Sequence, residues 1–261
     1  MSESFYEPLG DAGSGRWLAT EHTVGPWDPK AEHGGPPSAL LGRAIERCKP
    51  RDEMIISRFT CEILGPVPVG ELAVTARVAR PGRSVEMVEA VLEGGGRPVA
   101  TARAWRVLRT PAPGVPADPP AAPPLPAEPM ARTPEGWIDG YLSAIEWRPV
   151  HGEFGVPGPA TVWSRQRYPL VPGEEPSPLQ RVLIVADSGN GLASELDISH
   201  WQFINPELSV HLYREPAGEW ICLAAWTTIS TGGAGLASTV LSDRSGPVGS
   251  GAQSLLVTPR R

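Results

Sequence analysis

The sequence predicts an α+β protein with two similar halves, in each of which one helix packs on a long antiparallel sheet. Three observations predict this class: a proline-rich segment divides the chain, the stretches on its two sides resemble each other, and one helix candidate precedes the extended segments of each stretch. Apolar residues make up 41% of the 261 residues, so the chain can bury a core of ordinary globular density. Each half has a length that is usual for one structural unit.

The two helix candidates lie early in their halves. In the first half, HGGPPSALLGRAIE covers residues 33–46, and its apolar positions 40, 41, 44 and 45 fall at helical spacing. The two prolines of this segment come in the first turn, where a helix has no hydrogen bond to lose. In the second half, ADSGNGLASEL at residues 186–196 is the corresponding helix candidate.

The extended segments follow each helix candidate and repeat along the chain at an offset of 148 or 149 residues. The corresponding stretches are 59–64 and 208–213, 70–72 and 218–220, and 96–108 and 245–257. In both copies the apolar residues mostly alternate along four extended segments, with turns that contain Gly, Pro or Asp, as is typical of an antiparallel meander. We therefore expect two sheets that join edge to edge into one continuous antiparallel sheet.

The boundary between the halves is predicted in the segment 111–129, which contains nine prolines separated mostly by alanine. Such a stretch cannot donate the hydrogen bonds of a sheet, and it favours an extended polyproline conformation. We expect an N-terminal repeat at residues 1–112, a proline-rich linker at 113–130 and a C-terminal repeat at 131–261.

Composition and charge exclude several classes of protein. The chain has 23 Lys and Arg against 29 Asp and Glu, a net charge of −6, so nucleic-acid binding is disfavoured. No stretch approaches the roughly 18 consecutive apolar residues of a membrane span, and residues 1–15 do not resemble a secretory leader, so we expect a cytoplasmic protein. The three cysteines and five histidines show no metal-binding spacing, and nucleotide-binding glycine motifs are absent, so no metal or cofactor is expected.

Three motifs carry a resemblance to a known family: HGGPPSALLGRAIE at 33–46, NPELSVHLYR at 205–214 and SGAQSLLV at 250–257. Their order and spacing resemble those of the double-hotdog acyl-CoA thioesterases of the thioesterase II type. The resemblance implies two hotdog repeats, each a long helix wrapped by an antiparallel sheet, joined into one double hotdog. It also implies an enzyme of fatty acid metabolism that hydrolyses acyl-CoA or another acyl thioester to free acid and thiol, with a homo-oligomer as one option for assembly.

Thioester hydrolysis needs a water aimed at the carbonyl carbon, a group that takes its proton, and donors for the oxyanion. In the resembled family an Asp, a Thr or Ser and a Gln from the second repeat hold this water. Carried over by position, these roles fall on Glu207, Thr228 and Gln253, with Glu where Asp is expected. Because a Glu side chain is one methylene longer, Asp187 or Asn205 is the alternative for the carboxylate's role.

The start of the first helix candidate is expected to complete the site. Gly34 and Gly35 allow close approach to the backbone, and free N–H groups and the dipole at a helix start favour a developing oxyanion. The alternative is that these glycines only form a tight entry turn. We expect His33 to be a hydrogen-bonded packing residue rather than a base.

Two other functions remain open. One is a hotdog enoyl-CoA hydratase or dehydratase, which Asn205 and Pro206 favour, although no histidine follows them closely. The other is a noncatalytic acyl-CoA or lipid-binding protein. At the offset of 149 residues, the first half has Ala104 and Arg58 where the second has Gln253 and Glu207, so we expect one active site per chain.

Overall fold

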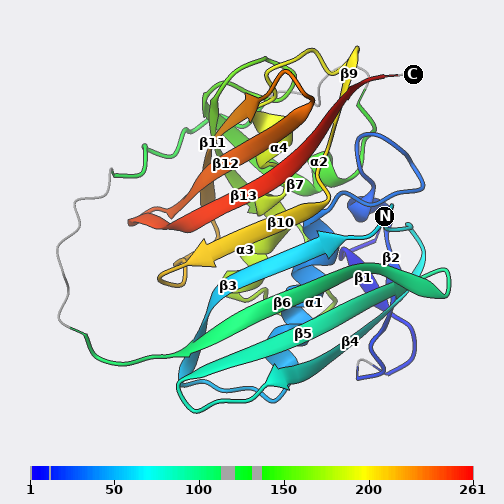
Figure 1. Ribbon diagram of the computed structural model, residues 1–261, viewed down its shortest axis with the longest axis vertical. Helices are drawn as coiled ribbons and strands as arrows, with labels where there is room; N and C mark the ends of the chain where they lie inside the picture. The colour runs from blue at the N-terminus through cyan, green and yellow to red at the C-terminus, as the bar shows by residue number, and fades with distance from the viewer. Residues whose placement is uncertain (1, 12, 113–120, 131–136, 261) are drawn as a thin grey trace.

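The chain folds into a double hotdog, as predicted, in which each half wraps a sheet around a central helix (Figure 1). The computed structural model describes residues 2–11, 13–112, 121–130 and 137–260. The N-terminal half contains β1 (Tyr6–Pro8), β2 (Arg16–Ala19), a short 3-10 turn (Glu21–Thr23), α1 (Gly35–Arg47), β3 (Met54–Ile63), β4 (Glu71–Arg80), β5 (Val85–Gly94) and β6 (Arg97–Leu108). The C-terminal half contains α2 (Tyr141–Ala144), β7 (Ile145–His151), β8 (Ala160–Gln166), α3 (Pro178–Ala186), α4 (Gly189–Leu192), β9 (Trp201–Ile204), β10 (Glu207–Leu212), β11 (Ile221–Ile229), β12 (Ala234–Asp243) and β13 (Gly246–Pro259).

The two half-sheets form one continuous antiparallel sheet of 13 strands, which confirms the predicted edge-to-edge pairing. The strand order is β1-β2-β4-β5-β6-β3-β10-β13-β12-β11-β8-β7, and β9 pairs with β13. Strands β3 and β10 meet at the centre, and the helices lie on one side of the sheet (Figure 1).

The register between β3 and β10 reflects the internal repeat. Phe59 pairs with Val210, and Cys61 pairs with Leu208. Position 208 is the repeat equivalent of 59, and position 61 is that of 210, at the offset of 149 residues. Exchanging the two halves therefore converts one pair into the other, as expected for halves related by a pseudo-twofold axis. Thr60 and Ser209 lie on that axis, with their hydroxyl oxygens 3.2 Å apart.

The central helices α1 and α3 pack directly against each other and run antiparallel. A Cβ atom on Gly35 would lie 2.1 Å from the carbonyl oxygen of Ile184, so only glycine allows this approach. At the other end of α1, the guanidinium of Arg43 donates to both carboxylate oxygens of Glu174 at 2.8 and 2.6 Å. These contacts fix the start of α1 beside the end of α3.

The second helix candidate was wrong in its position. The long helix of the C-terminal half is α3, which ends where the predicted segment begins, and the short α4 occupies only part of that segment. Ser177 caps α3 by accepting a hydrogen bond from the Gln180 N–H, and Pro178 begins the helix, which is a typical start signal. Gly189 and Gly191 disfavour continuation of the helix.

The described end of the proline-rich segment packs on the C-terminal half. The carbonyl of Pro123 accepts from the indole Nε1 of Trp163 at 3.2 Å, and that of Pro126 accepts from Nη1 of Arg148 at 2.9 Å. Residues 113–120 of the predicted linker lie outside the described residues, so the linker boundaries remain a prediction.

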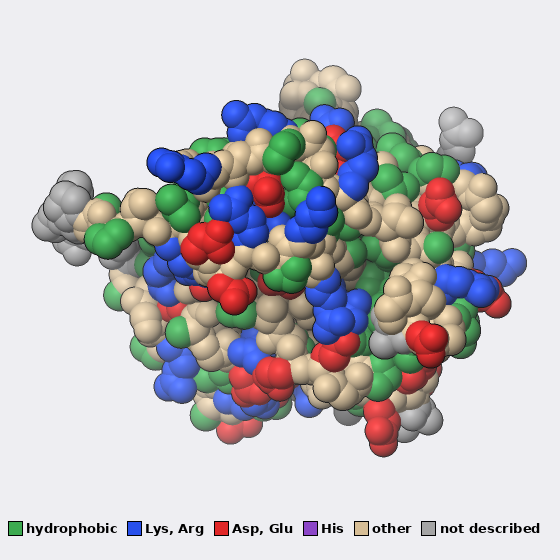
Figure 2. All heavy atoms as spheres, turned by 90° about the horizontal axis from the view of Figure 1, so that it is seen from below, with side chains coloured by type: hydrophobic (Ala, Val, Ile, Leu, Met, Phe, Trp, Pro, Cys, Tyr) green, Lys and Arg blue, Asp and Glu red, His purple; other side chains and the backbone are tan. Residues whose placement is uncertain are grey.

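The composition predicted neither a concentrated basic surface nor a membrane-spanning helix. On the face seen in Figure 2, basic and acidic side chains are interspersed rather than segregated into an extended basic surface. None of the helices in the described ranges has the length and apolar character that a membrane crossing requires.

Candidate active site

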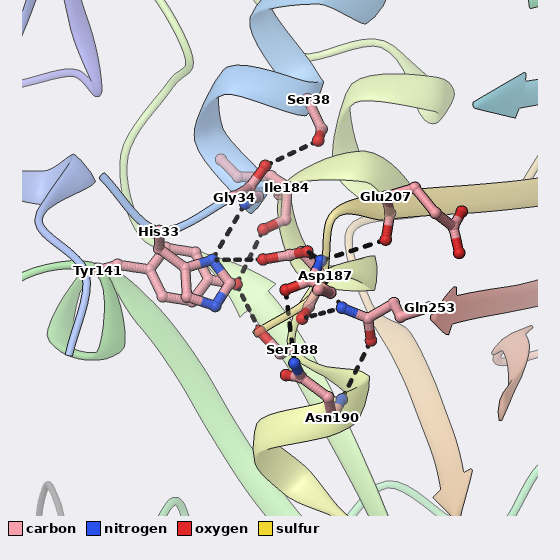
Figure 3. Close-up of polar contacts among 12 residues, drawn as sticks. His33, Gly34, Ser38, Tyr141, Ile184, Asp187, Ser188, Asn190, Glu207 and Gln253 are labelled. Carbon is pink, nitrogen blue, oxygen red and sulfur yellow. Dashed lines mark hydrogen bonds and ion pairs between the residues drawn. The ribbon is translucent and has the colours of Figure 1, made fainter. Parts of the chain in front are cut away.

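A cavity of about 420 Å³ lies between the two halves, beside the start of α1 and the end of α3. Its wall is largely apolar and aromatic, and includes Trp27, Trp137, Phe154 and Phe203. Polar groups converge at one place, where the first turn of α1 meets the break between α3 and α4 (Figure 3). An apolar cavity with a few converging polar groups is the usual form of a small-molecule site.

Asp187 is the centre of the polar cluster. It follows the last residue of α3 and is only 5% exposed. Its Oδ1 atom accepts hydrogen bonds from Nδ2 of Asn205 at 2.7 Å and from Nε2 of Gln253 at 3.1 Å. Two amide donors on one oxygen fix the carboxylate and leave Oδ2 to face the start of α1 (Figure 3).

Gln253 reaches this cluster from β13 and is 2% exposed. Besides Oδ1, its Nε2 donates to the backbone carbonyl of Asp187 at 3.0 Å, while its Oε1 accepts from the Asn190 N–H at 3.1 Å. The Gln253 amide therefore joins the end of α3 to the first turn of α4. Its contacts are those of a residue that positions Asp187.

Asn205 lies in the break between β9 and β10, immediately before Pro206. Its Nδ2 donates to Asp187 and, at 3.3 Å, to the backbone carbonyl of Glu207. The sequence favoured Asn205 as a substitute for the carboxylate or as part of the Asn-Pro element of a hydratase. The structure instead makes it a donor to the carboxylate of Asp187.

The first turn of α1 closes the other side of the cluster. A Cβ atom on Gly34 would lie 2.6 Å from Oδ2 of Asp187, so glycine allows this carboxylate to approach the helix start. The Gly35 N–H donates to Nδ1 of His33 at 3.0 Å and is therefore already occupied. Among the hydrogen bonds of the described residues, none is donated by the Gly34 N–H, which remains available to a ligand.

His33 packs at the edge of the cluster. Its ring stacks on that of Tyr141, with centroids 3.8 Å apart and planes inclined by 6°. Burial lowers the pKa of His33, against the opposing effect of the nearby Asp187, whose Oδ2 lies 3.5 Å from Nδ1. Because Nδ1 accepts from Gly35, the neutral ring carries its proton on Nε2. These contacts are those of the packing residue that the sequence favoured.

Comparison with known proteins assigns the chain to a family. A family model for the acyl-CoA thioesterase C-terminal domain matches residues 116–257, and one for the N-terminal domain matches residues 23–107. The chain belongs to the acyl-CoA thioesterase family. The resemblance seen in the sequence is thereby confirmed. No curated protein sequence matches the chain.

Solved structures share the fold of this acyl-CoA thioesterase family member at low sequence identity. A protein of unknown function with a hot dog fold from Alicyclobacillus acidocaldarius is 15% identical, with a TM-score of 0.74 over 94% of this chain and 93% of that one. A tesB protein of Mycobacterium avium subspecies paratuberculosis is 17% identical, with a TM-score of 0.70 over 96% of both chains. The acyl-CoA thioesterase II TesB2 of Mycobacterium marinum is 15% identical, with a TM-score of 0.64 over 88% of this chain and 90% of that one.

Two residues that the resemblance implied lie outside the cluster of this family member. Thr228 is exposed on β11, because strand alternation turns it away from the face that buries Thr227. The Glu207 carboxylate is engaged elsewhere: Oε1 accepts from the Ser254 N–H at 2.7 Å, and Oε2 accepts from the Ser209 hydroxyl at 3.0 Å. Only the Glu207 backbone carbonyl contacts the cluster, through Asn205.

A metal site has no support in the described ranges, where no three His, Cys, Asp or Glu side chains gather closely enough to hold an ion. The first histidine that follows the Asn-Pro element in the chain, His211, is exposed on β10 and takes no part in the cluster. The candidate site therefore consists of one carboxylate, two amides that bind it, and a helix start.

Proposed function

We propose that this family member hydrolyses acyl-CoA thioesters, with Asp187 accepting the proton of the attacking water. The observation that supports this role is the position of its carboxylate: two amides hold Oδ1, while Oδ2 faces the apolar cavity beside the start of α1. A fixed carboxylate next to an apolar cavity suits general base chemistry, because its acceptor atom needs no reorientation when substrate binds.

The proposed reaction runs in two steps. Water attacks the thioester carbonyl carbon and gives a proton to Oδ2 of Asp187, while the carbonyl oxygen becomes an oxyanion. The Gly34 N–H and the dipole of the 13-residue helix α1 stabilise this charge. The carbon–sulfur bond then breaks, and the proton held by Asp187 passes to the thiolate, which gives the free acid and the thiol.

Two arginines beside the cavity are suited to bind the CoA diphosphate. The guanidinium of Arg260 lies 5.2 Å from the ring centroid of Trp27, which is 44% exposed at the cavity mouth. Nη1 of Arg97 lies 3.5 Å from the point where a Cβ atom on Gly65, another residue of the cavity wall, would stand. Arginine forks match phosphate oxygens in geometry and charge.

The test is thiol release from acyl-CoA esters of increasing chain length by the purified chain and by Asp187→Asn. The parent protein should turn over at least one ester. Asp187→Asn keeps an oxygen that can accept from Asn205 and Gln253 but cannot take the proton, so kcat should fall about 10²- to 10⁴-fold.

The matched control is Asp197→Asn, which changes an exposed aspartate in the same half and should leave kcat within about twofold of the parent value. If the parent protein binds acyl-CoA but releases no thiol from any ester, the noncatalytic binding function replaces this proposal. Parent-like turnover by a folded Asp187→Asn variant would assign the proton to another group.

A further inference from the structure

Tyr141 is a buried residue that contacts both sides of the candidate site, although the proposed reaction does not use it. It is the first residue of α2 and is 0% exposed. It is not one of the residues that line the cavity, and it contacts the polar cluster from outside the cavity wall (Figure 3). Any influence of Tyr141 on the reaction must therefore pass through the residues that it contacts.

The Tyr141 hydroxyl connects two residues that lie close together in the chain. Its oxygen lies 2.8 Å from the backbone carbonyl oxygen of Ile184 and 2.8 Å from the hydroxyl oxygen of Ser188. Because a carbonyl oxygen only accepts, the single phenolic proton is donated to Ile184, and Ser188 donates its own proton to Tyr141. Burial raises the pKa of Tyr141, so the phenol keeps its proton near pH 7. The hydroxyl therefore joins residues on either side of Asp187.

The Ile184 carbonyl receives this hydrogen bond where the helix α3 ends. In a continued helix the Ser188 N–H would donate to Ile184, but it donates to the Val185 carbonyl at 3.0 Å instead. The Tyr141 hydroxyl thus takes the place of a backbone donor at the end of α3. It holds the turn from which the Asp187 carboxylate faces the start of α1 (Figure 3).

The Tyr141 ring supports the other side of the site. It stacks on the ring of His33, whose Nδ1 accepts from the Gly35 N–H in the first turn of α1. The Tyr141 N–H donates to the carbonyl of Val24 at 3.0 Å, which ties its backbone to the N-terminal half. One residue therefore contacts both the segment with the proposed base and the turn with the proposed oxyanion donor.

We propose that Tyr141 is a positioning residue, whose hydroxyl ties Ile184 to Ser188 and thereby holds the Asp187 carboxylate in line with the start of α1. The inference rests on the proposed function, since that function assigns the base and the oxyanion donor to these two segments. Both groups must meet at one thioester carbonyl, and a displacement of about 1 Å in such a site can lower the rate about 100-fold. The hydroxyl carries this role, because a phenylalanine would keep the stack on His33 but lose both hydrogen bonds.

The test is Tyr141→Phe, which removes the hydroxyl and keeps the ring. With the acyl-CoA ester that the parent protein turns over fastest, kcat should fall about 10- to 100-fold while KM stays within about threefold. The matched control is Tyr168→Phe in the same half. The Tyr168 ring also stacks on a histidine, His22, with centroids 3.9 Å apart, but it lies outside the cavity wall, so both values should stay within about twofold. Parent-like kcat in folded Tyr141→Phe, or an effect on KM alone, would overturn the inference.

A double-mutant cycle separates positioning from an unspecific structural effect. Ser188→Ala removes the group that donates to the Tyr141 hydroxyl, so it should also lower kcat. If the two hydroxyls act through one contact, the double variant should lose little more than the larger single loss. Losses that multiply would mean that the hydroxyls act independently, against the proposal. If Tyr141→Phe does not fold, parent-like kcat in folded Ser188→Ala would overturn the inference.

A readout without turnover separates this inference from the proposed function. In Tyr141→Phe, the Ser188 amide should exchange hydrogen about 10-fold or more faster relative to the Phe59 amide at the centre of the sheet, as measured by NMR, and Tyr168→Phe should keep the parent ratio. A faster relative exchange without thiol release by the parent protein would count against hydrolysis but support the role of Tyr141 in holding this turn. Thiol release, with parent-like exchange and kcat in Tyr141→Phe, would support hydrolysis and exclude that role.

Discussion

The two halves secure the ends of their central helices in different ways. In the N-terminal half, Arg106 of β6 donates to the backbone carbonyls of Cys48 and Lys49 at 2.9 and 3.0 Å, just after α1, and pairs with Glu86 at 3.0 Å. In the C-terminal half, Gln253 of β13 secures the end of α3 with a neutral amide. At the repeat offset, Ala104 replaces Gln253.

This difference has consequences for the space beside each helix end. A cavity of about 280 Å³ beside the end of α1 is lined by Arg106 and Glu46, and by Ile56 where the repeat offset places Asn205 in the other half. The Glu46 carboxylate there accepts from the Ser177 hydroxyl and the Gln180 amide, each at 2.8 Å, so it has one amide donor among the described residues where Asp187 has two. Both halves therefore share the helix and antiparallel sheet. Among the described residues, only the C-terminal half combines a carboxylate with two amide donors.

The largest effect that tests this comparison is expected from Gln253→Ala. Without the amide, Asp187 loses a donor on Oδ1, and the first turn of α4 loses its acceptor, so kcat should fall about 10²- to 10³-fold with a smaller change in KM. Steady-state kinetics with the best acyl-CoA ester measure kcat and KM.

The control for Gln253→Ala is Thr228→Ala, which changes an exposed residue of β11 that the sequence placed in the site. It should leave kcat and KM unchanged. A folded Gln253→Ala variant with parent-like kcat would exclude the proposed role of Gln253 in positioning Asp187.

Much of the fold could be predicted from the sequence because its signals are local or repeated. Alternating apolar residues and a constant offset predict the paired sheets, and the prolines near residue 36 predict the start of α1. The position of the second helix was missed because the apolar run after Ser177 and Pro178 was not recognised as a start. The strands β1, β2, β7, β8 and β9 lie outside the repeated stretches and were not predicted.

The site was less predictable, because it depends on contacts between segments that are distant in the chain. Gln253 and Asp187 are 66 residues apart, and only the fold shows that they touch. The alternation of side chains along a strand could have excluded Thr228, because it points to the face of the sheet opposite that of the buried Thr227. No local signal marks Asn205 as a donor to Asp187, because that contact depends on the break before Pro206.

A smaller effect, on stability, is expected at the seam between the helices. In Gly35→Ala, the new methyl group would lie 2.1 Å from a backbone carbonyl of α3, so the helices must separate, and the free energy of unfolding should fall by about 1–3 kcal/mol. Gly42→Ala is the matched control within α1, because its nearest atom is the movable Cδ1 of Leu183. Urea denaturation should show a change within about 1 kcal/mol for the control. Equal losses would mean that the start of α1 is no tighter than its middle.

The smallest effect concerns His33, the N-terminal half's packing contribution to the site. Burial lowers its pKa below 6.5 in the folded chain, and unfolding restores the ordinary value. Between the two values the unfolded chain binds the extra proton, so this contribution to stability is complete above about pH 6.5 and falls as the pH falls towards the folded pKa. Replacing His33 with Gln removes the titration, so the free energy of unfolding should depend less steeply on pH, by at most about 1.4 kcal/mol per pH unit.

Urea denaturation from pH 5 to 8 measures the slope, with the exposed His151→Gln as the control that should keep the parent slope. If His33→Gln also keeps the parent slope, the imidazole is no more sheltered in the folded chain than in the unfolded one, and the N-terminal half supplies only the helix start.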